Sequence, residues 1–99
     1  MVRIVVTIDP DIKELIPGFI KNRYEDIFCL QQHILNRDFN AIRILGHSMK
    51  GFGAGYGFYG ISDLGASLES AAIREDIPEL EVLHQEFSNY LEQIDIVYE

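Results

Sequence analysis

The sequence contains a single cysteine, Cys29, among its 99 residues. One cysteine cannot form an internal disulfide, so we expect the chain to fold without crosslinks in the reducing cytoplasm. No stretch approaches the roughly 18 apolar residues of a membrane-spanning helix. The apolar run over residues 2–8 is too short for a signal peptide and lacks a small-residue cleavage site. Secretion and insertion into a membrane are therefore not expected.

Basic residues are also scarce. Eight lysines and arginines stand against sixteen aspartates and glutamates, which gives a formal net charge of −8. This balance repels DNA, RNA and anionic lipid, so neither a nucleic acid nor a membrane surface is an expected partner. The apolar share of 47% and the charged share of 24% are ordinary for a soluble domain. A chain of this length can bury a core without metal or disulfide, so we expect one domain over residues 1–99.

Apolar residues at intervals of three and four predict a series of helices. Asp9 and Pro10 have the residue types of an N-cap and a first helical position, and the short helix that they begin is expected to end near Leu15. Longer helices are expected at residues 17–36, after the cap residue Asp38, around residues 61–71, and from the cap residue Asp76 through Ile94.

The apolar stripes of these helices form the expected core. In the first long helix the inward residues are Ile20, Tyr24, Ile27, Leu30 or Gln31, and Ile34. Gly53 and Gly55 are expected to loosen the end of the next helix. The run over residues 2–8 is expected to be a short extended lead-in or a strand, and no strand signal is present beyond the first eight residues. With short links between helices, we expect an all-α fold, an antiparallel four-helix bundle preceded by a short N-terminal helix. One such bundle buries all the stripes, so a monomer is expected.

One histidine lies away from the apolar stripe of its helix. At about 100° per residue, the stripe consists of Ile42, Leu45, Met49, Phe52 and Tyr56. His47 falls roughly opposite this stripe and is expected to point to solvent. Its neighbours on the same face are Arg43, Lys50, Gly51 and Ala54, and Ile44 lies off the stripe about 60° from His47. Glycine inside a helix costs roughly 0.5 to 1 kcal/mol relative to alanine, so Gly51 suggests space for another surface to approach.

Residues 46–51 read Gly-His-Ser-Met-Lys-Gly. This segment resembles the signature of histidine-containing phosphotransfer (HPt) domains, which typically reads His-Ser/x-Leu-Lys-Gly. The resemblance extends to residues 8–17, 54–58 and 61–65, and so covers almost the whole chain. Met49 stands where the family usually has leucine, a volume-conserving change at a position facing the core. Phe52 and Gly53 occupy positions where the family often has small polar residues.

The resemblance implies that His47 is the phosphoacceptor, that Lys50 contacts the phosphoryl group, and that Gly51 leaves room for a docking receiver domain. The implied function is that of a phosphocarrier in a two-component phosphorelay. It would accept a phosphoryl group from a receiver-domain aspartate and pass it to another receiver. The implied partners are response-regulator receiver domains, a hybrid sensor histidine kinase, or both.

The residue types fit this chemistry. An imidazole nitrogen is a good nucleophile near pH 7, and phosphohistidine keeps a high transfer potential. Arg43 is expected to assist Lys50 at longer range, and Ala54 and Ile44 to belong to the partner-binding surface. The sequence places no general base, metal ligand or oxyanion hole beside His47. We therefore expect a carrier rather than an enzyme, with no metal or cofactor of its own and with Mg²⁺ supplied by the partner.

Other motifs are weaker. Residues 55–60 fit G-x-G-x-x-G, but no strand precedes them. Glu81 and His84 form a Glu-x-x-His, which needs a second copy to make a di-iron site. His33 and His84 are expected at the surface or partly buried, and Cys29 as a small core or boundary residue. The alternative function is a non-phosphorylated helical interaction or scaffold bundle that docks a signalling partner.

Overall fold

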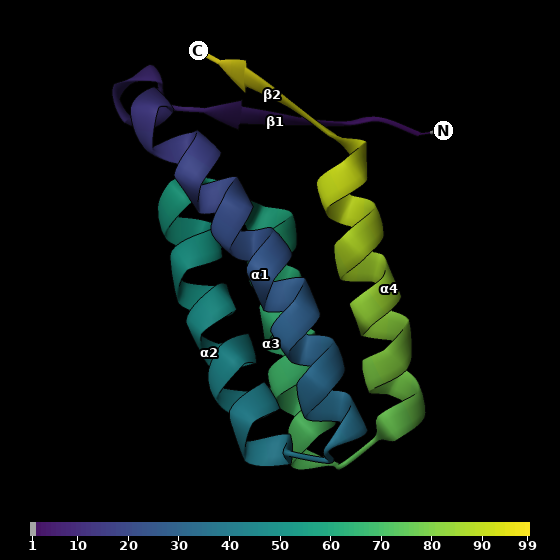
Figure 1. The fold of residues 1–99 in the computed structure, drawn as a ribbon. Helices are drawn as coiled ribbons and strands as arrows, with labels where there is room; N and C mark the ends of the chain where they lie inside the picture. The colour runs from purple at the N-terminus through teal and green to yellow at the C-terminus, as the bar shows by residue number, and fades with distance from the viewer. Residues whose placement is uncertain (1) are drawn as a thin grey trace.

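The computed structural model describes residues 2–99 and is mostly helical, with four α-helices packed beside one another and two short strands across one end of them (Figure 1). In chain order the elements are β1 (Ile4–Ile8), the 3₁₀-helix η1 (Pro10–Leu15), α1 (Ile16–Leu35), α2 (Phe39–Tyr56), α3 (Tyr59–Ile73), α4 (Ile77–Gln93) and β2 (Ile94–Tyr98). Within these residues no helix has the length and apolar character needed to cross a bilayer.

Three aspartates cap the N-termini of the helices that they were predicted to begin. The Asp9 side chain accepts a hydrogen bond from the Asp11 N–H, Asp38 accepts from Ala41, and Asp76 accepts from Glu79. Each bond satisfies an N–H that has no partner within its own helix. The predicted helix starts are therefore confirmed at all three caps.

The two strands form a small parallel sheet, in which Ile4 lies opposite Ile94 and Ile8 lies opposite Tyr98. The possible strand near the N-terminus is confirmed for Ile4–Ile8, and residue 1 lies outside the described residues. The all-α expectation is wrong for Ile94, which has extended backbone angles and begins β2 instead of continuing the last helix. The β-branched residues of β2 suit a strand, and β1 gives them a partner.

The predicted inward face of α1 is confirmed at Leu30 and Ile34, which are buried, and Ile20 and Ile27 are partly buried against the core. The prediction is wrong at Tyr24. Phe19 is 5% exposed and Arg23 is 8% exposed, whereas Tyr24, expected to face inward, is 46% exposed. The reason is a cluster of rings around Phe19, which stacks on Phe58 and meets Phe52 edge to face. An aromatic cluster of this kind stabilises the face that carries it, so the buried face of α1 extends to Phe19 and Arg23 and leaves Tyr24 outside.

Glycines allow α2 and α3 to pack with their backbones in contact. A Cβ atom on Gly46 would lie 2.6 Å from the Gly65 oxygen, and one on Gly65 would lie 2.5 Å from the Gly46 oxygen. On Gly53 it would lie 2.6 Å from the Ser62 nitrogen. The expectation that Gly53 loosens its helix is therefore wrong, because it is packed against α3 and α2 continues to Tyr56. The helix ends at Gly57, whose φ of 90° suits glycine.

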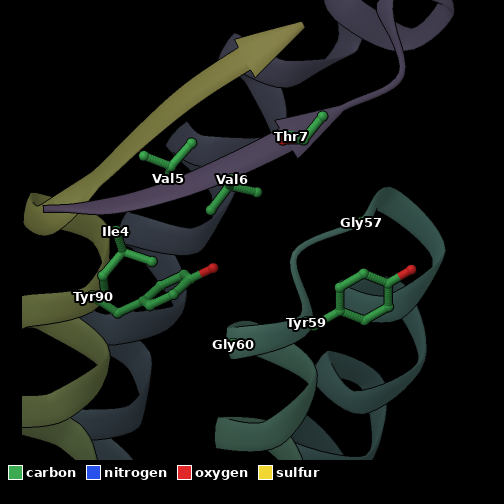
Figure 2. Close-up of a pocket in the computed structure, with 8 residues that line it drawn as sticks. All are labelled: Ile4, Val5, Val6, Thr7, Gly57, Tyr59, Gly60 and Tyr90. Atoms are coloured by element: carbon green, nitrogen blue, oxygen red, sulfur yellow. The ribbon is translucent and has the colours of Figure 1, made fainter. Parts of the chain in front are cut away.

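The strand pair leaves a hollow of about 370 Å³ between β1 and the turn that joins α2 to α3 (Figure 2). Val5 and Tyr59 are both largely exposed at its rim, and Tyr90 and Gly60 line it as well. None of its lining residues carries a formal charge at pH 7, and none belongs to the histidine face of α2. The hollow is thus lined by uncharged residues and is separate from the predicted site.

Candidate functional site

His47 lies near the middle of α2 with its side chain 72% exposed. Ile42 and Met49 are fully buried on the opposite side of the helix. The predicted exposure of His47 is therefore confirmed. It follows from the amphipathic spacing of α2, because the helix must turn its apolar stripe towards its neighbours.

The positions predicted to surround His47 are also on the solvent side. Arg43, Lys50, Gly51 and Ala54 are all exposed, and Ile44 is 51% exposed. The Arg43 guanidinium donates a hydrogen bond to the Asn40 side-chain oxygen at 3.0 Å. No atom lies within 4 Å of the place where a Cβ on Gly51 would be. The surface next to His47 thus has open space one turn away.

Glu69 of α3 is a site residue that the sequence analysis missed. Its Oε2 lies 3.0 Å from Nδ1 of His47, and its own side chain is only 23% exposed. The expectation that no acid–base group stands beside His47 is therefore wrong. The contact depends on the glycine packing, because Gly46 precedes His47 and Gly65 lies one turn before Glu69. Paired glycines on neighbouring helices are the sequence signal for this contact.

The contact fixes the orientation of the imidazole. An ionised carboxylate only accepts hydrogen bonds, so the proton of a neutral His47 is assigned to Nδ1 and the lone pair to Nε2. Because the side chain is largely exposed, the Nε2 side of the ring is open to an incoming group. The arrangement therefore presents an oriented nucleophilic nitrogen to a partner.

Two cations share a depression with Glu69, the partner of His47. Lys50 and Arg74 line a depression of about 280 Å³ that also includes Glu69. The Ser62 hydroxyl of α3 donates to the Lys50 carbonyl at 2.8 Å and so links α3 to α2 at Lys50. Positive charge at this place can neutralise an anion bound near His47.

The remaining candidate motifs do not assemble a site. Among residues 2–99 no group of three or more histidine, cysteine, aspartate or glutamate side chains is arranged to hold a metal ion. Nε2 of His84 is buried without a hydrogen-bond partner in the described chain. Gly57 makes the turn between two helices, so residues 55–60 do not follow a strand. Cys29, expected in the core or at its boundary, is exposed.

Comparison with known proteins adds no assignment: no family model, curated protein or solved structure matches the chain.

Proposed function

We propose that this chain is a phosphocarrier of a two-component phosphorelay. His47 accepts a phosphoryl group from the aspartate of one receiver domain and passes it to the aspartate of another. The observation that carries the proposal is an exposed imidazole whose Nδ1 contacts the Glu69 carboxylate at 3.0 Å, next to open space at Gly51. The resemblance of residues 46–51 to the phosphotransfer signature supports the same function.

The proposed transfer balances with the groups at hand. The Nε2 lone pair of His47 attacks phosphorus, the N–P bond forms, and the bond from phosphorus to the aspartate oxygen breaks to release a carboxylate. The ring keeps its proton on Nδ1 and gains a positive charge, which the Glu69 carboxylate stabilises through their hydrogen bond. Attack by the carboxylate of a second receiver reverses these steps and restores the neutral imidazole.

Positive charge on this face supports the phosphorylated form. Lys50 lies one turn after His47 and is exposed, so its ammonium group can reach the phosphoryl oxygens. Arg43 lies one turn before His47 and contributes at longer range. Positioning and charge stabilisation account for most catalysis of phosphoryl transfer, and in this proposal the receiver supplies its Mg²⁺. The chain is then a carrier and not an enzyme.

The face around His47 suits the docking of a receiver domain. Gly51 and Ala54 add little bulk to it, and Ile44 offers an apolar contact on the same surface. Transient interfaces commonly depend on a few such anchors. We therefore propose receiver domains, a hybrid sensor histidine kinase, or both as partners of a cytoplasmic carrier built on an antiparallel four-helix bundle.

The test is phosphotransfer profiling of the full chain against phosphorylated receiver domains of the source organism. The expected product is an acid-labile, base-stable phosphate on the wild type, absent from His47→Gln and retained in the control variants His33→Gln and His84→Gln. Glu69→Gln keeps a hydrogen-bond acceptor but loses the charge, and it should slow the transfer about tenfold or more. Labelling of His47→Gln at the wild-type level would refute the assignment. The absence of labelling by every receiver would favour a scaffold bundle that only docks a partner.

A further inference from the structure

A second hollow, of about 430 Å³, lies between α1 and α2. Phe52 and Tyr56 of α2 line one side of it, and Gly18, Asn22 and Arg23 of α1 line the other. Neither His47 nor Glu69 is among its lining residues. It is a separate feature of the surface, within the size range of small-molecule sites.

Arg23 is the unusual residue of this hollow, because it is a cation that is only 8% exposed. Its guanidinium lies over two aromatic rings, 3.9 Å from the centroid of Phe52 and 4.5 Å from that of Phe19. Its Nε donates a hydrogen bond to the Asp26 carboxylate at 2.8 Å. Within residues 2–99, no oxygen accepts a hydrogen bond from either terminal nitrogen, Nη1 or Nη2.

An arginine in this position has unused binding capacity. A guanidinium carries five N–H donors, four of them on the terminal nitrogens. The ring contacts and the bond to Asp26 compensate for the burial of most of the side chain. The terminal nitrogens are not among the buried polar atoms without a partner in the described residues, so they remain accessible from solvent. An acceptor with two oxygens in one plane matches the terminal nitrogens, as in bidentate arginine–carboxylate pairs.

We propose that this hollow binds a small aromatic monocarboxylate. Its carboxylate is held by the terminal nitrogens of Arg23, and its ring packs against Phe52 and Tyr56. A monoanion is favoured over a phosphate dianion because the Asp26 carboxylate is adjacent and the chain carries a net charge of −8. Asn22 offers a further amide donor at the same hollow.

The experiment is a titration of the full-length chain with benzoate and phenylacetate, followed by backbone amide NMR shifts. We expect saturable shifts of residues around the hollow, with a Kd of about 1 mM. Benzylamine, which has the opposite charge, and inorganic phosphate serve as comparison ligands. Neither should give saturable chemical-shift changes. The lack of saturable shifts with either carboxylate would overturn the proposal, and so would equal affinity for phosphate.

Three variants locate the binding. Arg23→Lys keeps the charge but removes the planar pair of donors, and it should weaken binding at least tenfold. Gly18→Leu leaves Arg23 in place and fills the open side of the hollow, since no atom lies within 4 Å of a Cβ there. It should stay folded and lose binding even if the first variant unfolds. Lys21→Gln, an exposed charge on the same helix, is the control and should bind normally. Unchanged binding by Gly18→Leu would refute the proposed location.

Discussion

Replacing Gly51 by glutamine should separate the stability of the bundle from its ability to transfer phosphate. Gly51 lies inside α2, and a Cβ added there meets no atom of another element within 4 Å. Glutamine is a much better helix former than glycine, so the free energy of unfolding should rise by up to about 1 kcal/mol. For a domain of this size that corresponds to an increase in Tm of roughly 4 to 8 °C.

Gly53 provides the matched comparison two residues along the same helix. Its Cβ would lie 2.6 Å from the backbone nitrogen of Ser62, so α2 and α3 must move apart to admit even alanine. Overpacking of this kind typically costs about 1 to 3 kcal/mol. Thermal unfolding followed by circular dichroism should therefore give a higher Tm for Gly51→Gln and a lower Tm for Gly53→Ala.

Transfer should change in the opposite sense to stability at Gly51. The glutamine side chain would project into the space beside His47 that a docking receiver would occupy under the proposed function, so the rate of transfer from a phosphorylated receiver should fall severely. A small donor such as phosphoramidate needs no docking surface, and if it labels the wild type it should still label this variant. Full receiver-dependent transfer by a stabilised Gly51→Gln would refute the steric argument for the site.

Three further variants test other parts of the molecule. Lys50→Ala should slow transfer or shorten the phosphohistidine lifetime about ten- to 150-fold, because a hydrogen bond to a charged group is worth roughly 1.5 to 3 kcal/mol. Its Tm should change little. Unchanged transfer kinetics would show that Lys50 is only a solvated surface charge. Ile44→Glu should weaken receiver binding, measured by calorimetry, without loss of helicity; unfolding would instead place Ile44 in the core. Burial raises the pKa of Asp26, and its Arg23 partner opposes this only in part. The protonated form of Asp26 thus favours folding below its ordinary pKa, and this contribution is lost as the pH rises through the raised value. In urea unfolding, Asp26→Asn should therefore become more stable relative to the wild type as the pH rises through the pKa of Asp26. A difference in unfolding free energy between the two proteins that does not change with pH would contradict the burial argument.

The sequence predicts those features that depend on neighbours along the chain. The caps at Asp9, Asp38 and Asp76 are local, because each aspartate bonds an N–H two or three residues away. The exposure of His47 is also local, since it follows from the stripe of its own helix. A few residues within one element are enough to derive such features.

The features that the sequence analysis missed depend on distant partners. Glu69 meets His47 because α2 and α3 approach closely at Gly46 and Gly65. The glycines indicate that a close approach is possible, but the spacing within either helix does not show which helices are neighbours. Arg23 is counted as a surface residue by type, and its burial depends on Phe52 from another helix. The strand from Ile94 exists because β1 lies beside it, although its first residue also continues the helical stripe.

That strand pair also bears on the order in which the molecule folds. Ile4 and Ile94 are partners ninety residues apart, whereas most helical contacts are made within a few residues. Bringing together the ends of so long a flexible loop costs about 4 kcal/mol in chain entropy, apart from a constant term. The helices can shorten that loop by packing first, with Val6 and Ile8 of β1 buried in the core. The sheet should then form late, and its amides should exchange with solvent sooner than those of the central helices.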